Sequence, residues 1–448
     1  MLEFGLGLLS KLESLLDRRD IPWKNLVIGF TLAQFTFERL LIRQFLALRQ
    51  YRKLQSKTIP KALAGVIDQD TFDKSQAYGR AKAKFGFFTS VYGLVQNLAV
   101  LSFNVLPWMW YATGSLVPKF PVQVQGPILN SILFIFAFVN ISTVLNLPTS
   151  LYSTFVLEES FGFNKQTLRL FFTDMVKSSI LGMVIGTPVL YAFLKIIDYF
   201  GKSFFVYLWA FFLAFQFVMI TIYPIFIQPL FNKLEPLPEG KLRSEVENLA
   251  SSLKFPLKHL YVIDGSKRSA HSNAYLFGLP WAKHIVLFDT LIEQSSTEQV
   301  VAVLAHELGH WKLSHTSRLL AISQVQIFFT FALFSAFISN NSVYQSFGFP
   351  AGVKPILVGF LLYNDILTPL DSVLTLLMNM LSRKHEYEAD EFAAKLNYKD
   401  ELAEALIKLQ VSNLSTMDPD TWFSAYHHSH PVLTERLRAI GFKGKKSL

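Results

Sequence analysis

Residues His306, Glu307 and His310 form the pattern in this chain that most directly suggests chemistry. They belong to the pentapeptide His-Glu-Leu-Gly-His within the helix-like run 297–315. Positions i and i+4 share one face of a helix, so the two histidines can bind one metal ion together. Glu307 lies beside them, where its carboxylate can take a proton from zinc-bound water. This H-E-x-x-H spacing predicts a zinc protease helix with Glu307 as general base. Chance occurrence and a purely structural zinc site are the alternatives.

A catalytic zinc needs a third protein ligand and an open position for water. The acidic stretch 385–391 is the candidate source of that ligand. Glu386 and Asp390 are four residues apart, so both can face the zinc helix. We expect Glu386 to bind the metal and Asp390 to accept the N–H of a ligating histidine, which fixes its tautomer. Glu388 and Glu391 then point elsewhere. The alternative is a solvated acidic helix end.

The segment before the zinc helix has the pattern of a small mixed domain. Residues 239–254 are helix-like, and 260–263 and 285–288 are short runs typical of strands. Asn273 lies between those runs, where a strand edge beside a zinc helix can bind a peptide by β-addition. We expect Asn273 to hold the peptide backbone, with an ordinary turn residue as the alternative. Ser296 and Gln299 have capping-box spacing and predict the start of the zinc helix.

The composition is that of a membrane protein. Of 448 residues, 51% are hydrophobic and 17% are charged, against about 25% charged in soluble domains, and the mean hydropathy is +0.32. Runs of about 20 apolar residues predict transmembrane helices, and buried core helices are the alternative. Seven such runs are found, at 25–45, 86–112, 127–148, 179–197, 203–230, 319–340 and 353–380.

Lysine and arginine placement predicts the orientation of these spans. The loop after the first span carries nine basic residues between Arg49 and Lys84, which places it in the cytosol. Alternation then puts 231–318 and 382–448 on the cytosolic side together. Basic residues in the N-terminal stretch, among them Lys11 and Arg18, oppose this assignment. The predicted units are therefore 1–230 and 319–381 in the membrane, with 231–318 and 382–448 as cytosolic regions.

Charge and cysteine content exclude two further classes of site. The net charge of +9 resides mostly in basic residues that flank membrane spans, so we expect membrane lipid and no nucleic acid as a partner. The chain has no cysteine, which excludes disulfides and cysteine ligands for zinc. Any zinc site must therefore use histidine and carboxylate ligands.

Several motifs, in order along the chain, resemble those of the CAAX prenyl protease 1 family. Members of that family are integral-membrane gluzincin proteases that process farnesylated a-factor and prelamin A. The resemblance rests on the H-E-x-x-H pentapeptide together with Ser-Arg-x-x-Glu-Tyr-x-Ala-Asp at 382–390, on 155–165, on 264–268 leading to 272–275, and on Ser-His-Pro at 429–431 followed by Glu-Arg-Leu at 435–437.

The resemblance implies a role for each matching residue. One zinc ion per chain would be held by His306, His310 and Glu386. Glu307 would be the general base and later pass its proton to the leaving amine, while Asp390 would partner a ligating histidine. The remaining two assignments concern the substrate: His430 would stabilise the oxyanion, and Asn273 would help seat the peptide. His427 and His428 are the alternatives to His430. Arg436 is interpreted as structural and stays outside the predicted site.

The implied fold is mainly α: seven membrane helices form a barrel around a water-filled chamber, with a small α+β zinc domain at its cytosolic end. Polar residues inside the predicted spans support a wet interior, and hydrogen bonds between helices are the alternative. These residues are Gln34, Gln96, Asn97, Asn140, Asn146, Gln216, Gln324, Asn364 and Asp365.

The implied reaction is zinc-dependent endoproteolysis by a monomer that removes the last three residues of prenylated CAAX proteins, with a second, upstream cut in a-factor-type precursors. A membrane quality-control zinc protease is the enzymatic alternative, and a channel, transporter or receptor with an incidental zinc site is the other. Lys445 and Lys446 form a K-K-x-x pattern at the C-terminus, which predicts retrieval to the endoplasmic reticulum membrane. The inner nuclear membrane is a second expected location.

Overall fold

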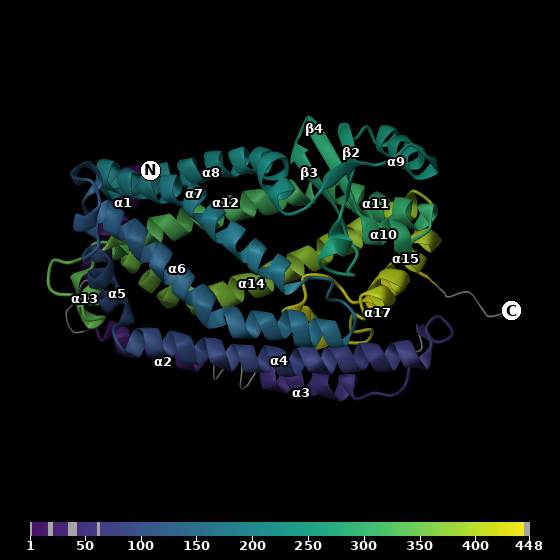
Figure 1. Cartoon of the computed structure of the whole chain (residues 1–448), viewed down its shortest axis with the longest axis horizontal. Helices are drawn as coiled ribbons and strands as arrows, with labels where there is room; N and C mark the ends of the chain where they lie inside the picture. Colours follow the sequence, from purple (N-terminus) through teal and green to yellow (C-terminus); the bar gives the residue numbers. More distant parts are fainter. Residues whose placement is uncertain (1, 17–20, 35–42, 61–62, 443–448) are drawn as a thin grey trace.

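Long helices run along most of the length of the molecule, and a small sheet with shorter helices lies at one end (Figure 1). The computed structural model describes residues 2–16, 21–34, 43–60 and 63–442. Lys445 and Lys446, and part of the first predicted span, lie outside these residues. The helices of the first half are α1 (Leu2–Leu16), α2 (Trp23–Gln34), α3 (Arg43–Leu54), α4 (Gln69–Ser102), α5 (Val105–Gly114), α6 (Pro127–Tyr152), α7 (Leu168–Phe200) and α8 (Phe204–Ile222).

The second half alternates between the sheet region and further helices. The sheet region comprises β1 (Leu234–Pro236), α9 (Lys241–Ser252), β2 (Leu257–Ile263), β3 (Ala274–Leu279), β4 (Ala282–Phe288), α10 (Asp289–Gln294) and α11 (Thr297–Lys312). It is followed by α12 (His315–Phe337), α13 (Asn341–Ser346), α14 (Ile356–Lys395), α15 (Lys399–Ser412), α16 (Thr421–His427) and α17 (Leu433–Ala439).

Several of these helices are long and apolar enough to cross a membrane, so the chain is a multi-pass membrane protein. Among the described residues four helical runs meet this test, or five if the two halves of α14, bent by 64°, count as one span. One run, Leu168–Leu230, contains both α7 and α8. These two helices pack against each other on either side of Gly201, which has φ 51°. The count of seven stays a prediction.

Three of the polar side chains predicted inside the membrane helices bond to their own helix. The amides of Asn140, Asn146 and Asn364 each donate to the carbonyl four residues earlier, at 2.8, 2.8 and 2.7 Å. Gln324 donates instead across α12 and α8 to Gln216 at 2.7 Å. Each of these five residues therefore has one protein partner, whereas the buried Oε1 of Gln324 has none among the described residues.

Burial of the membrane helices supports the chamber on other grounds. In the apolar windows of Gln69–Ser102 and Leu168–Leu230, 6% and 11% of residues are buried. A helix in a solid bundle buries at least one face. Helices that border lipid on one side and open space on the other would show such low burial, and the chamber stays a prediction.

The sheet has the order β1-β2-β4-β3 and packs against α11, the helix that carries the H-E-x-x-H pattern. β2 and β4 are parallel, with Leu260 opposite Ile285, and β3 is antiparallel to β4. The predicted runs 260–263 and 285–288 are thus strands, and 239–254 contains α9. Leu260 and Ile285 are buried in one core with Val301 and Leu304 of α11, so this packing fixes the position of the helix.

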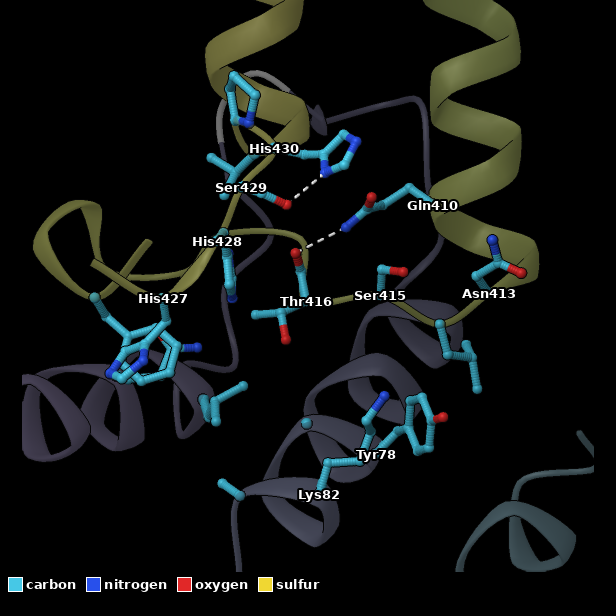
Figure 2. A pocket seen from close by; sticks show the side chains of 18 of the residues that line it. Tyr78, Lys82, Gln410, Asn413, Ser415, Thr416, His427, His428, Ser429 and His430 are labelled. Carbon is cyan, nitrogen blue, oxygen red and sulfur yellow. Dashed lines mark hydrogen bonds between the residues drawn. The ribbon is translucent and has the colours of Figure 1, made fainter. Parts of the chain in front are cut away.

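The C-terminal residues come back to lie over α4. A pocket of about 740 Å³ is lined by Tyr78 and Lys82 of α4 and by the segment 427–430. Figure 2 shows these side chains on facing sides of the pocket, with Gln410 and Thr416 between them. The fold therefore places the C-terminal histidines beside a cavity.

Candidate metal centre and active site

Helix α11 is fixed at its start by a capping box and along its length by burial. Ser296 and Gln299 form the predicted capping box, each side chain bonding the backbone N–H of the other residue. The next turns are almost wholly buried. His306 and His310 therefore project from a helix that is held at its start and along its length.

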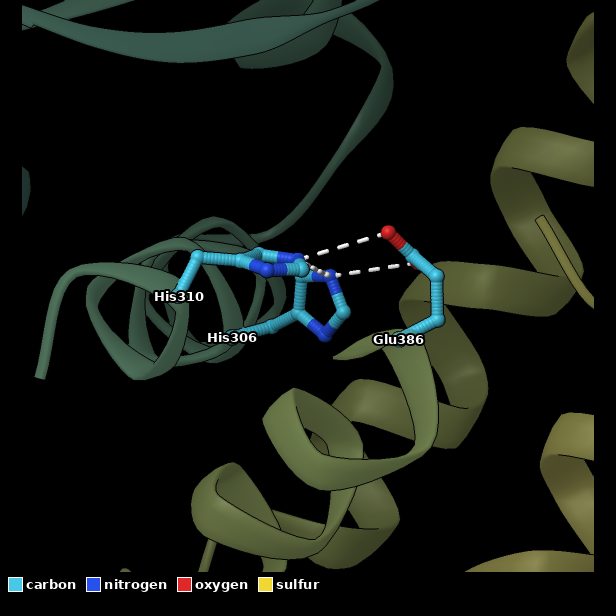
Figure 3. A group of neighbouring side chains, drawn as sticks. All are labelled: His306, His310 and Glu386. Carbon is cyan, nitrogen blue, oxygen red and sulfur yellow. Dashed lines mark hydrogen bonds and ion pairs between the residues drawn. The ribbon is translucent and has the colours of Figure 1, made fainter. Parts of the chain in front are cut away.

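Glu386 of α14 meets the two histidines of α11. The His306 and His310 Nε2 atoms are 3.2 Å apart, and they lie 3.6 and 3.4 Å from the two Glu386 carboxylate oxygens (Figure 3). Ligands about 2.0–2.1 Å from a tetrahedral zinc are about 3.3 Å from one another. Buried Glu386 Oε2 has no hydrogen-bond partner in the described part of the chain, and a cation there would satisfy it. The three residues fit a zinc ion.

Gly309 allows α14 to approach α11 closely. A Cβ at this position would lie 3.1 Å from Phe392 Cδ1 and 3.3 Å from Ala389 Cα. The turn of α14 that carries Glu386 and Asp390 can therefore lie directly against the metal-binding face. Within the pentapeptide, the glycine thus positions the third ligand.

Asp390 takes the position expected for the partner of His306. Its side chain is fully buried, and its Oδ1 accepts from His306 Nδ1 at 2.8 Å. That bond leaves Nε2 of His306 free of a proton and directed at the metal position. Asp390 also accepts two hydrogen bonds from Arg436 of α17, at 2.6 and 2.8 Å.

Arg436, interpreted from the sequence as structural and left outside the predicted site, contacts two residues of the candidate site. Besides binding Asp390, its Nη1 lies 3.4 Å from Glu386 Oε2. Burial opposes its charge, but the hydrogen bonds to Asp390 and the carboxylates around it raise the pKa of Arg436. The guanidinium therefore compensates two buried carboxylates at the metal site. Sequence reasoning missed this because nothing in the Glu-Arg-Leu pattern indicates which carboxylate the arginine faces.

Glu307 follows His306 directly, but its carboxylate is not among the atoms close enough together to bind one metal ion. Burial raises the pKa of its carboxyl group, while His306 and His310 act in the opposite direction. A carboxylate with a raised pKa beside a metal position is suited to accept a proton and release it again.

Comparison with known proteins agrees with this geometry. Residues 50–233 match the family described as CAAX prenyl protease N-terminal, five membrane helices, and residues 236–441 match peptidase family M48. CAAX prenyl protease 1 of Saccharomyces cerevisiae is 46% identical, over 97% of this chain and 99% of the relative. The chain belongs to the CAAX prenyl protease 1 family.

A human relative and one solved structure are also similar over nearly the whole chain. The Homo sapiens CAAX prenyl protease 1 homolog is 38% identical over 97% of this chain and 99% of its own length. The crystal structure of S. mikatae Ste24p matches with a TM-score of 0.88 and 45% identity, covering 94% of this chain and all of that one. As a family member the chain is a membrane metalloprotease, and its predicted mainly α, multi-pass fold with a small sheet-containing domain is confirmed.

Of the two predicted substrate residues, His430 lies beside the candidate metal site, and Asn273 lies at the start of a strand. His430 Nε2 is 3.3 Å from Glu386 Oε1, and the side chain is 67% exposed. This contact favours His430 over His427 and His428 as the oxyanion donor. Asn273 directly precedes the edge strand β3, and its side-chain oxygen accepts from the Ala274 N–H at 2.8 Å.

His315 is a second residue that the sequence reasoning missed. Its Nδ1 lies 2.9 Å from Nδ1 of His310, and its Nε2 lies 2.9 Å from Glu388 Oε2. Glu388 does point away from the metal position, as expected, but it reaches His310 through His315. The only sequence signal was a histidine five residues after His310, a spacing that a continuous helix would turn away from the ligand face.

Proposed function

We propose that this protease is a zinc endopeptidase that removes the C-terminal tripeptide from prenylated CAAX proteins. The single observation that carries the zinc assignment is the near-tetrahedral spacing of the ligand atoms of His306, His310 and Glu386. The substrate class is supported by the full-length similarity to CAAX prenyl protease 1 of Saccharomyces cerevisiae. A second, upstream cut in a-factor-type precursors is part of the proposal.

Each site residue has a distinct role in this mechanism. His306, His310 and Glu386 hold the metal, and Asp390 keeps His306 in the tautomer that leaves Nε2 unprotonated. When bound, zinc polarises the scissile carbonyl and lowers the pKa of water. Glu307 accepts the proton of the attacking water and later delivers it to the leaving amine.

The remaining residues act on the substrate. His430 donates a hydrogen bond to the oxygen that becomes negative as water attacks, and its position beside Glu386 Oε1 supports this role. Asn273 holds the peptide backbone where it enters alongside the edge strand β3.

We further propose the predicted cellular location and membrane topology. The protein lies in the endoplasmic reticulum membrane, and also in the inner nuclear membrane, with the regions 231–318 and 382–448 in the cytosol. It acts as a monomer in contact with lipid. The basic loop between Arg49 and Lys84 and the K-K-x-x pattern support this orientation.

The function is tested with purified, detergent-solubilised protein and a farnesylated CAAX peptide. Mass spectrometry should find a product that lacks the last three residues, no product after zinc chelation, and recovery when zinc is returned. The same peptide without the farnesyl group and the Glu307→Gln protein are the controls. Chelator-resistant cleavage, or cleavage at another bond alone, would refute the proposal.

A further inference from the structure

His310 is linked to a second imidazole through the ring nitrogen that does not face the metal position. Its Nδ1 lies 2.9 Å from Nδ1 of His315, whose Nε2 lies 2.9 Å from Glu388 Oε2. The chain reaches this arrangement because α11 ends at Lys312 and Ser314 adopts φ 60°. That left-handed residue redirects the backbone, so the first side chain of α12 faces back toward α11.

The positions of the protons follow from the chemistry of neutral imidazole, which has one N–H and one acceptor nitrogen. If His310 binds a metal through Nε2, its proton is on Nδ1, and it must donate that proton to Nδ1 of His315. His315 then carries its own proton on Nε2 and donates it to Glu388. Both short distances are satisfied by this single assignment.

The surroundings hold His315 in place for this role. His315 is 1% exposed, and its ring stacks on that of His385, with centroids 4.0 Å apart and planes 9° from parallel. Glu388 is held from its other oxygen by Lys384 at 3.8 Å. The orientation of His315 is therefore fixed by packing as well as by hydrogen bonds.

A second metal site is the competing interpretation, because ligand atoms of His315, His385 and Glu388 lie within 4.8 Å of one another. Both ring nitrogens of buried His385 also lack a partner among the described residues. However, a metal lies close to the plane of each imidazole that binds it, and these two rings are parallel and stacked. The proton on His315 Nε2 would also have to leave. The geometry therefore favours the hydrogen-bonded chain.

We propose that His315 and Glu388 are positioning residues that hold His310 in the tautomer whose Nε2 binds the catalytic metal. The inference rests on the proposed zinc site. It gives each histidine ligand an outer carboxylate: Asp390 contacts His306 directly, whereas Glu388 acts on His310 through an intervening imidazole. Such outer partners typically contribute about 10–100-fold to metal affinity or activity.

Zinc affinity of the full-length protein in detergent, measured by competition with a chromophoric chelator, tests the proposal without a substrate. His315→Leu should weaken binding about 10–100-fold, and Glu388→Ala about 10-fold. His315→Asn should recover part of the loss, because its side-chain oxygen can accept at the position of Nδ1. Glu391→Ala is the matched control on α14, since Glu391 pairs with Lys395 at 2.6 Å, and it should bind zinc like the unaltered protein.

The outcomes separate this proposal from the zinc site on which it rests. Unaltered protein that binds no zinc, or His310→Ala that retains it, contradicts the proposed function. Normal zinc affinity in both His315→Leu and Glu388→Ala, with the His310 result as expected, contradicts the positioning role alone. Two zinc ions per chain, with one lost in His385→Phe, would establish the second metal site instead. If His315→Leu does not fold, the partly exposed Glu388 position decides the question.

Discussion

Polar side chains at the metal centre and three asparagines of the membrane helices find their hydrogen-bond partners in opposite ways. At the metal centre they bond between elements far apart in the chain, as when Arg436 of α17 holds Asp390 of α14. In the membrane helices Asn140, Asn146 and Asn364 bond to their own helix. A side chain that bonds its own helix adds little to tertiary structure. We therefore expect substitutions at the metal centre to be far more damaging than those in the spans.

The largest effect should come from the ligands and the general base. His310→Ala should abolish both zinc binding and cleavage, because two ligands do not hold the ion. Glu307→Gln should retain zinc and lower kcat at least 10²–10⁴-fold, the range for removing a general base. Metal content by mass spectrometry and cleavage of the farnesylated peptide separate the two. Near-normal cleavage by Glu307→Gln would remove Glu307 from its role.

Substitution of Arg436 tests whether contacts between α14 and α17 at the metal centre stabilise the fold. Arg436→Met leaves Asp390 and Glu386 buried without their cation, and breaking a buried pair costs about 3–5 kcal/mol. Thermal unfolding of the metal-free protein should show the loss. Arg438→Met, at an exposed position of the same helix, is the control. Equal stability of the two variants would mean that Arg436 does not compensate these carboxylates.

His430 tests an effect confined to the transition state. Loss of one oxyanion donor typically lowers kcat about 10²–10³-fold, so His430→Ala should do so with KM and zinc content nearly unchanged. Because the His430 side chain is exposed, we expect His430→Ala to fold normally. If kcat stays intact, His427→Ala and His428→Ala become the next variants to measure.

Accessibility of the spans tests the chamber directly. The chain has no cysteine, so single cysteines at Gln96, Asn140 and Asn364 can be labelled unambiguously with a small water-soluble maleimide in membranes. These positions should react severalfold faster than Phe134 and Leu333, of which Phe134 is fully buried. Equal protection at all five positions would indicate a dry helix bundle.

The smallest effect should come from an asparagine that bonds its own helix. Asn146→Leu should change the free energy of unfolding by at most about 0.5 kcal/mol, as expected for sites without tertiary partners. Gln216→Leu should cost more, about 0.6 kcal/mol or above, since it breaks the bond from Gln324 between two helices. A larger loss of unfolding free energy in Asn146→Leu than in Gln216→Leu would show that bonds within one helix matter more here than bonds between helices.

The sequence predicted those parts of the site that depend on local geometry. His306, His310, Glu386 and Asp390 follow helical i, i+4 spacing, and the capping box is a four-residue pattern. Each can be read without knowing what packs against the helix.

The missed parts depend on tertiary contacts or on backbone direction. Arg436 lies 130 residues from His306, which it contacts, and His315 faces its partner only because Ser314 redirects the chain. The number of spans is open for a related reason. Apolar length does not show where a helix bends, as α14 does by 64°.

Gly309 provides no metal ligand, but it determines how closely α14 approaches α11 at the proposed metal site. A methyl group there must push α14 away by a few tenths of an ångström, because it would meet Phe392 and Ala389 at 3.1–3.3 Å. The ligand set would be unchanged, but the carboxylate would stand farther from the two imidazoles. Gly309→Ala should therefore alter which ion fits, favouring cations larger than zinc. We therefore expect the absence of a side chain at Gly309 to favour an ion of the size of zinc at the proposed site.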